Sequence, residues 1–245
     1  MSQANDISRL PVIDGQLSEQ ERAFITKVIR EAPNKPQIAV EVGTWLGGGS
    51  TLHILRALHA NGAGHLWGVE ASKDICEKML ANIRLGAPEA VARFTPLFGL
   101  STDVLPGWLQ SLSANANIDV VFLDGGGNPL EQIEEFRLLA HRIKLGGVLM
   151  SHDARTRKGK WFVPYISLLD NWKVEILDFT FAGLLHATKL KPDPTPASLN
   201  AAERKLRKMR RETKELVARF LPSWVCGFIL RALPARLNRR LTIEA

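Results

Sequence analysis

Apolar and polar positions along the chain form blocks that predict strands and helices in alternation. Seven short, mostly apolar segments predict β-strands, at residues 35–45, 65–72, 91–99, 117–127, 147–153, 173–179 and 183–190. Apolar residues at helical spacing predict helices before and between them, at residues 17–31, 50–62, 73–86, 101–112, 128–147 and 161–172. Continuously apolar strands that alternate with helices are typical of a parallel sheet buried on both faces. We therefore expect an α/β fold, with a doubly wound, Rossmann-like, mostly parallel sheet of seven strands and an antiparallel last strand.

Composition divides the chain into a body and a basic tail. Residues 1–190 are expected to form the sheet domain, with an N-terminal helix and a Rossmann-like core that starts near residue 35. Residues 191–200 are rich in proline and predict a linker. Residues 201–245 predict a basic, amphipathic helical extension with twelve Lys and Arg against four Glu. Since the whole chain carries +7, the body is close to neutral, which argues against a nucleic-acid-binding body.

The tail has several possible partners. Its Trp224 and Phe228 lie among arginines, a pattern typical of helices that settle on an anionic membrane surface. The same apolar residues could instead pack on the domain or across a homo-oligomer interface, and the cations could bind nucleic acid. The N-terminus lacks an apolar signal region and the two cysteines lie far apart. We therefore expect a cytoplasmic protein, with peripheral attachment to the inner membrane face as the alternative.

The ends of the predicted strands carry the polar residues that could perform chemistry. In doubly wound sheets, ligands bind beyond the carboxyl ends of the strands. These ends lie at residues 41–49, 70, 99–102, 124–128 and 152–155. We therefore expect one site that gathers these segments.

The turn after the first strand, EVGTWLGGGS from Glu41 to Ser50, predicts a ligand-binding loop. Glycines let a ligand approach the backbone closely, and the helix that starts beyond them offers free N–H groups. Trp45 breaks the G-x-G-x-x-G pattern of dinucleotide-binding turns. An acidic residue at the start of the turn also suits an ammonium group better than a pyrophosphate. An NAD(P)-dependent oxidoreductase of Rossmann type is therefore the alternative that this turn disfavours.

The same turn resembles the first motif of class I S-adenosylmethionine-dependent methyltransferases, which is an acidic residue followed by G-x-x-x-G. Glu41, Gly43 and Gly47 match that motif, and the resemblance extends from residue 35 to residue 190. It implies that the turn holds the methionine part of S-adenosylmethionine. The residues concerned are Glu41, Gly43, Thr44, Gly47 and Ser50.

Three further strand ends extend the resemblance. Glu70 matches the acidic residue that binds the ribose hydroxyls in this family, and a carboxylate can accept two hydroxyl hydrogen bonds. Ser101 lies in the segment that would flank the adenine. Asp124, in the sequence VVFLDGG, would contact the cofactor and face the reaction centre.

Asp124 and Asp153 end neighbouring strands, and two carboxylates brought together favour a divalent cation between them. In this respect the chain resembles the metal-dependent O-methyltransferases of the catechol, caffeoyl-CoA and sugar-modifying types. The resemblance implies a cation such as Mg²⁺ on Asp124 and Asp153. Two positions depart from that pattern: Ala154 stands where an Asn ligand would follow, and Gly127 stands where a catalytic Lys would lie.

His152 precedes Asp153 and has three possible roles. An imidazole with a pKa near 6.5 can take a proton from a hydroxyl at neutral pH, so we predict His152 and Asp124 as catalytic residues. A replacement metal ligand and a structural hydrogen-bonding group are the alternatives for His152. The basic segment 155–160 predicts either a solvated loop or a mobile lid over an acidic or phosphorylated substrate.

Together these features predict an S-adenosylmethionine-dependent methyltransferase that methylates a hydroxyl group. The acceptor would be a small molecule, a sugar or a lipid-linked glycan. A non-catalytic, membrane-associated Rossmann-like protein is the remaining alternative.

Overall fold

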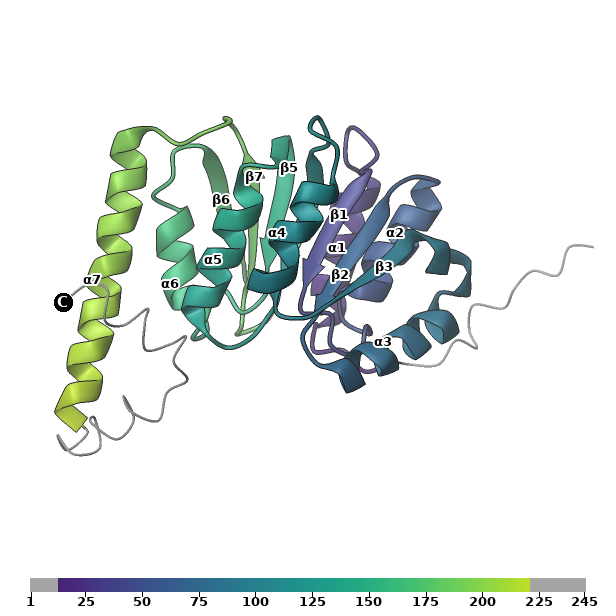
Figure 1. The fold of residues 1–245 in the computed structure, drawn as a ribbon, viewed down its shortest axis with the longest axis horizontal. Coiled ribbons are helices and arrows are strands. Elements are labelled where there is room, and N and C mark those ends of the chain that lie inside the picture. Colours follow the sequence, from purple (N-terminus) through teal and green to yellow (C-terminus); the bar gives the residue numbers. More distant parts are fainter. Residues whose placement is uncertain (1–12, 221–245) are drawn as a thin grey trace, which may run out of the picture.

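The computed structural model describes residues 13–220, with side chains as far as residue 213. Its strands are β1 (Ile38–Val42), β2 (His65–Glu70), β3 (Phe94–Phe98), β4 (Ile118–Leu123), β5 (Ile143–Ser151), β6 (Trp172–Leu177) and β7 (Leu184–Lys189). Its helices are α1 (Glu19–Arg30), α2 (Thr51–Asn61), α3 (Lys73–Gly86), the 3₁₀ helix η2 (Pro88–Arg93), α4 (Ser101–Ser111), α5 (Pro129–Ala140), α6 (Gly159–Ile166) and α7 (Pro196–Phe220) (Figure 1). The predictions for Trp224 and Phe228 lie outside the described residues.

The seven strands form one sheet in the order β3-β2-β1-β4-β5-β7-β6. Neighbours from β3 to β5 run parallel, whereas β7 is antiparallel to both β5 and β6. The predicted doubly wound sheet with an antiparallel last strand is therefore confirmed. Because β1 and β4 lie side by side at its centre, the turns that follow them meet at one edge of the sheet.

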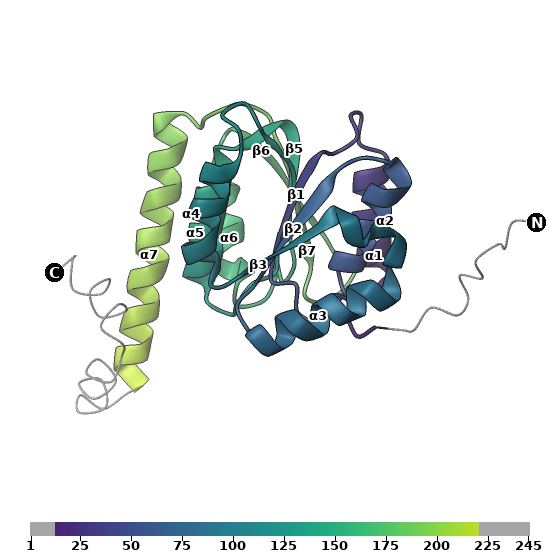
Figure 2. The same cartoon turned by 45° about the vertical axis from the view of Figure 1, so that its right-hand side comes forward.

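Helices cover both faces of the sheet, with α1, α2 and α3 on one side and α4, α5 and α6 on the other (Figure 2). Two clusters of buried side chains fill the spaces between these layers. Ile25, Leu55 and Met79 belong to the cluster beneath the first three helices. Trp108 and Phe136 belong to the cluster on the opposite face. A sheet buried on both faces explains why its central strand β4 is apolar and buried along its length.

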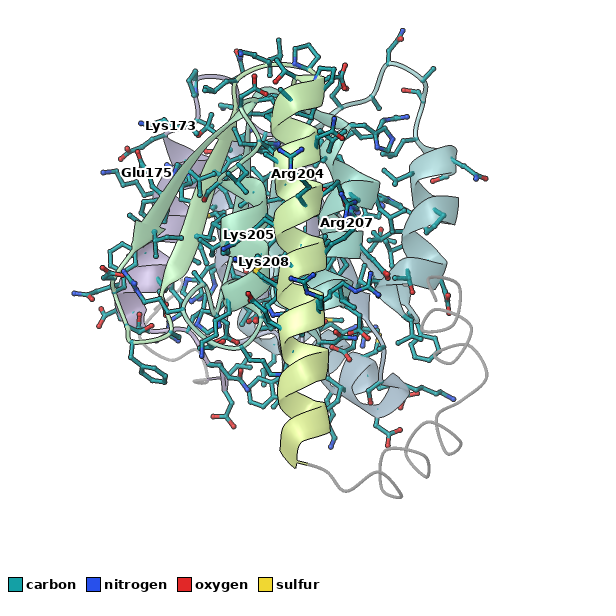
Figure 3. The ribbon with its side chains drawn as sticks, turned by 90° about the vertical axis from the view of Figure 1, so that its left-hand side faces the viewer. Lys173, Glu175, Arg204, Lys205, Arg207 and Lys208 are labelled. Atoms are coloured by element: carbon teal, nitrogen blue, oxygen red, sulfur yellow. The ribbon has the colours of Figure 1, made fainter. Side chains whose placement is uncertain are left out.

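The last described helix, α7, stands against α6 at the edge of the domain (Figure 1). It begins at Pro196, within the segment 191–200 that the sequence predicts as a linker. Leu206 is buried in the core cluster, and the Tyr165 hydroxyl donates a hydrogen bond of 2.8 Å to Glu203. Its opposite side carries cations, several of which are labelled in Figure 3. Within residues 13–220, no helix is both long and apolar enough to cross a membrane.

One predicted boundary is wrong. The sequence pattern extends the helix before the fifth strand to Gly147, but α5 ends at Ala140 and β5 already begins at Ile143. Ile143 pairs with Ile118 of β4, and the register between these strands then shifts. Apolar residues such as Ile143 fit both a helical and a strand pattern, so periodicity alone does not fix this boundary.

Candidate active site

A cavity of about 1250 Å³ opens at the carboxyl ends of β1, β2 and β4. Its walls include six of the residues predicted to bind the cofactor, namely Gly43, Thr44, Ser50, Glu70, Ser101 and Asp124. Glu41 and Gly47 lie behind this wall, and Gly47 packs against Met79 of α3. Residues predicted from separate strand ends are therefore gathered around one cavity.

The turn after β1 is fixed by its neighbours. Gly43 has a φ of 87°, a conformation that favours glycine. A Cβ atom at this position would lie 2.3 Å from the carbonyl oxygen of Asp124, so the close approach also requires glycine. The amide of Gly43 donates to the Val69 carbonyl at 3.0 Å, and the amide of Asp124 donates to the Val42 carbonyl at 2.8 Å. Backbone contacts thus join the ends of β1, β2 and β4.

Glu70 ends β2 at the cavity wall. Its Oε2 atom accepts a hydrogen bond of 3.0 Å from the amide of Trp45, and its Oε1 atom accepts one of 3.0 Å from the amide of Ser72. Each carboxylate oxygen can accept more than one hydrogen bond. Two backbone amides therefore hold Glu70 in place while its remaining lone pairs stay available to a ligand with hydroxyl groups.

Glu41 is fully buried beneath the turn. The Ser50 hydroxyl donates a hydrogen bond to its Oε1 atom, whereas its Oε2 atom has no hydrogen-bond partner among the described residues. Burial raises the pKa of Glu41 to about 7, against the opposing effect of the Ser50 hydrogen bond. The hydroxyl of Thr44, also buried, has no partner in this part of the chain either. Unpaired buried polar atoms are costly, so this turn suits a polar ligand.

Ser101 leads to a residue that the sequence pattern missed. Its hydroxyl donates a hydrogen bond of 2.6 Å to Glu135 of α5, and both residues line the cavity. Burial raises the pKa of Glu135 to about 7, although the Ser101 hydrogen bond acts in the opposite direction. In the sequence, Glu135 is one of three glutamates in the segment LEQIEEFR, and nothing there distinguishes it from a solvated helix residue.

Asp124, His152 and Asp153 lie together beyond the ends of β4 and β5. One ligand atom from each of them lies within 4.8 Å of the others. The His152 Nδ1 atom is 3.5 Å from Asp124 Oδ2 and 3.9 Å from Asp153 Oδ1. On a continuing strand, His152 and Asp153 would point in opposite directions. They do not, because β5 ends at Ser151 and Asp153 turns back with a φ of 63°.

Lys158 completes this group, although the sequence pattern placed it in a solvated loop or a lid. It is buried at the start of α6, and its Nζ atom lies 2.7 Å from Asp124 Oδ1 and 3.1 Å from Asp153 Oδ2. A third contact joins Nζ to the Gly125 carbonyl at 3.2 Å. Burial lowers the pKa of Lys158, but the adjacent Asp124 and Asp153 outweigh it and raise that pKa above its usual value.

Glu21 of α1 approaches His152 from the other side and was also missed. Its Oε1 atom lies 3.6 Å from His152 Nε2 and accepts a hydrogen bond of 3.0 Å from the Thr180 hydroxyl. Burial lowers the pKa of His152, but Asp124, Asp153 and Glu21 together raise it above the ordinary value. The only sign of Glu21 in the sequence is the Ser18-x-x-Glu21 capping box at the helix start, which has no connection to chemistry.

Asp124 stands between the cavity and the buried histidine. Asp124 is part of the cavity wall, whereas His152, which is 6% exposed, is behind it. Asp153 likewise lies outside the wall. A ligand in the cavity therefore reaches His152 through Asp124.

Asp124, His152 and Asp153 have the ligand types that a divalent cation requires, but the adjacent Lys158 ammonium already supplies the positive charge. Carboxylate and imidazole groups are common metal ligands. However, a cation bound to Asp124 at about 2.1 Å would lie against the Lys158 ammonium, which is 2.7 Å from the same carboxylate oxygen. With Lys158 in place, the site does not fit the divalent cation that the sequence resemblance implies.

Two polar residues from the predicted strand ends have structural roles here. The Asn128 side chain accepts a hydrogen bond of 3.1 Å from the Leu130 amide and caps α5, as its position before a helical segment predicts. Arg155 forms an ion pair of 2.6 Å with Asp178, at the surface of the domain.

Known structures share this fold at low sequence identity. The O-methyltransferase from Bacillus cereus, solved in complex with SAH, is 19% identical, with a TM-score of 0.60 over 74% of this chain and 85% of its own. A methyltransferase from Geobacter sulfurreducens is 17% identical, with a TM-score of 0.56 over 71% and 80%. The SAH-bound methyltransferase PaMTH1 from Podospora anserina is 12% identical, with a TM-score of 0.57 over 71% and 80%. No curated protein sequence matches the chain significantly.

The strand order, the antiparallel β7 and the glycine turn after β1 are those of the class I methyltransferase fold. Residues 40–154, which run from β1 to the Asp153 turn, match the family described as "Methyltransferase domain". This match favours an S-adenosylmethionine-dependent methyltransferase over the two alternatives considered above, a Rossmann-type oxidoreductase and a non-catalytic protein.

Proposed function

We propose that the chain methylates a hydroxyl oxygen of a polar small molecule, sugar or glycan. The observation that carries this proposal is Asp124, which lies at the wall of the cofactor cavity and also touches the buried His152 and Lys158. Proton removal and cofactor binding can therefore take place within one site. Similar structures that are named O-methyltransferases support the choice of oxygen as the acceptor atom.

The proposed cofactor site has two halves. Thr44, Ser50 and the glycines after β1 would hold the methionine part of S-adenosylmethionine, with Glu41 beneath them accepting the hydrogen bond of Ser50. Glu70 would bind the ribose hydroxyls, and Ser101 would lie beside the adenine. The unpaired Thr44 hydroxyl and the two amides that fix Glu70 support this arrangement.

In the proposed reaction, the acceptor hydroxyl donates its hydrogen bond to Asp124. When bound, S-adenosylmethionine supplies a methyl group whose bond to sulfur breaks as its bond to the acceptor oxygen forms. The hydroxyl proton passes to the Asp124–His152 pair. A hydrogen on His152 Nε2, which faces Glu21, leaves Nδ1 free to accept that proton, and Nδ1 has no hydrogen-bond partner among residues 13–213. Positioning and proton removal are the main contributions of the protein in this scheme.

The rest of the cavity supports a polar acceptor. Beyond Asp124, the wall continues along α5 and reaches α7, where Arg137, Leu206 and Arg210 line it. A ligand lying there would meet these two cations and the carboxylates of α5, beside the apolar side chains of Leu130, Ile133 and Leu206. The charged groups suit a sugar or another hydroxylated molecule better than a fully apolar one.

Calorimetry with SAH tests the cofactor site directly. We expect binding at micromolar concentrations, with and without Mg²⁺. In Glu70→Gln the charge that accepts the ribose hydroxyls is lost, so affinity should fall about tenfold, equivalent to roughly 1.4 kcal/mol. Glu77→Gln is the matched control, because Glu77 is exposed on α3. A folded protein that shows no SAH binding would disprove the proposed function.

We also propose that α7 attaches the enzyme peripherally to the cytoplasmic face of an anionic membrane. Its outward side carries the exposed Arg204, Lys205, Arg207 and Lys208 (Figure 3), while Leu206 packs inward. Each cation near an anionic lipid surface contributes about 1 kcal/mol.

Co-sedimentation with lipid vesicles tests this attachment. The full chain should sediment with phosphatidylglycerol vesicles and should stay in solution with phosphatidylcholine vesicles. Replacing the four cations with glutamine should abolish this binding. Equal binding to both lipids, or a preference for nucleic acid over vesicles, would contradict the proposal.

A further inference from the structure

The ammonium group of Lys158 lies where two carboxylates converge. Its Nζ atom is 2.7 Å from Asp124 Oδ1, 3.1 Å from Asp153 Oδ2 and 3.2 Å from the Gly125 carbonyl oxygen. An ammonium group has three N–H donors, and these three contacts use all of them. The Lys158 side chain is only 8% exposed. It is therefore a fixed part of the site.

The backbone before α6 holds Lys158 in this position. Both Thr156 and Gly159 donate backbone hydrogen bonds to the Asp153 carbonyl, at 3.1 Å and 3.2 Å. A Cβ atom on Gly159 would lie 2.0 Å from the carbonyl oxygen of Ala154, so the chain closes too tightly there for any side chain. This tight turn brings Lys158 back to Asp153, where the loop starts.

The charge that Lys158 supplies is the one that the two aspartates require. Two ionised carboxylates held close together repel each other, and a nearby cation relieves that repulsion. A divalent cation would use the same carboxylate oxygens, and it would be repelled by an ammonium group in direct contact with them. The two cations therefore exclude each other from this position.

We propose that Lys158 is the resident cation of this methyltransferase, so that its ammonium group replaces a divalent metal ion and methyl transfer does not require one. Lys158 is a positioning residue in this scheme. It keeps Asp124 oriented toward the acceptor hydroxyl. Asp124, His152 and Asp153 then form a latent metal site, which becomes able to bind a divalent cation only when the ammonium is removed.

Manganese binding tests this inference without any turnover. The loss of the free Mn²⁺ signal in electron paramagnetic resonance measures binding to wild-type protein and to Lys158→Ala. We expect no specific binding to wild type and at least tenfold tighter binding to Lys158→Ala. The double variant Lys158→Ala/Asp153→Asn should lose this Mn²⁺ binding, because one of the proposed ligands is removed. Lys160→Ala is the matched control, because it removes an exposed lysine two residues away and should leave the protein without bound Mn²⁺.

Activity provides the second measurement. Wild-type methyl transfer should be unchanged by a strong chelator. Lys158→Ala should lose at least tenfold in kcat and recover part of it with Mn²⁺ or Mg²⁺, whereas Lys158→Arg should retain activity without metal. Stoichiometric Mn²⁺ binding by wild type, or loss of wild-type activity on chelation, would overturn the inference, and neither result depends on the variant folding. A folded Lys158→Ala protein that binds no Mn²⁺ would also overturn it.

This inference deepens the proposed function, yet the two can fail separately. SAH binding tests the methyltransferase site, and Mn²⁺ binding tests the cation position. If the wild-type protein binds both SAH and Mn²⁺, the proposed function stands and the inference about Lys158 is wrong.

Discussion

The Nε2 atom of His152 lies 3.6 Å from the Oε1 atom of Glu21, a buried carboxylate in the first turn of α1. The other oxygen of Glu21 accepts hydrogen bonds from the amide and hydroxyl of Ser18, at 2.8 Å and 2.9 Å. The N-terminal helix therefore places a carboxylate beside His152 through the same residue that completes its capping box. Asp124, Asp153 and, through them, Lys158 are the other charged groups that face His152.

Glu21→Gln should shift the pH dependence of methyl transfer. Glutamine can replace glutamate in a capping box, so the helix start is kept while one negative charge beside His152 is lost. That charge helps to raise the pKa of His152, so in the variant this pKa falls and the imidazole becomes neutral at lower pH. The acidic limb of the kcat/KM profile should move to lower pH. An unchanged limb would show that Glu21 has no influence on the reacting proton, and Glu19→Gln, exposed in the same turn, is the control.

Asp124→Asn should reduce kcat by about 100-fold or more, as expected for loss of a group that takes part in proton removal. The amide keeps the size of the side chain but cannot accept the hydroxyl proton or balance Lys158. Single-turnover rates at saturating S-adenosylmethionine measure the effect on the chemical step. Asp74→Asn, an exposed substitution in α3, should leave the rate unchanged. A rate for Asp124→Asn within a few-fold of wild type would remove Asp124 from the mechanism.

Glu41→Gln should change how stability depends on pH. Burial raises the pKa of the Glu41 carboxyl from its ordinary value of 4.5 to about 7 in the fold, so between these values the folded state binds a proton that the unfolded state does not. Stability from this group is therefore present at low pH, falls as pH rises through that window and levels off above pH 7. The shift corresponds to about 3 kcal/mol.

Urea unfolding at pH 5 and pH 8 measures this effect. From pH 5 to pH 8, wild type should lose about 3 kcal/mol of its free energy of unfolding relative to Glu41→Gln, because the variant lacks the titrating carboxyl. Glu135 has a raised pKa of the same kind, but it is present in both proteins and cancels in the difference. If the difference between the two proteins is the same at both pH values, Glu41 is already ionised in the fold.

Leu206→Ala tests whether α7 is part of the domain. Leu206 is 3% exposed in the core cluster, and removal of a buried leucine side chain costs about 2–5 kcal/mol. Leu199→Ala, on the same helix at 39% exposure, should cost less than 1 kcal/mol. Chemical denaturation of both variants gives the comparison. Equal small effects would mean that α7 can detach without loss of stability.

The strand ends that meet at the centre of the sheet could be predicted from the sequence, because parallel neighbouring strands bring their carboxyl ends to one edge. For this reason the sequence alone predicts that Gly43, Glu70 and Asp124 lie at one edge of the sheet, and all three line the same cavity. Glu21 could not be predicted, because the docking of α1 depends on packing between distant segments. Its local pattern signals only a helix start.

Lys158 shows a second limit of sequence patterns. A run of basic residues is typical of exposed loops, and Arg155 does lie at the surface. Lys158 is buried because the closure at Gly159 turns one member of that run inward. A short-range backbone geometry of this kind is not encoded in composition or periodicity.

The contact between Gly43 and Asp124 has a consequence for precision. The backbone after β1, which would hold the methyl donor, touches the backbone that carries the carboxylate facing the acceptor, with no side chain between them. Rotamer changes and thermal motion of side chains therefore have little effect on the distance between the Gly43 and Asp124 backbones. In the proposed mechanism the main chain sets the spacing between donor and acceptor, so substitutions elsewhere in the cavity would alter which acceptor is methylated without disturbing the alignment that methylation needs.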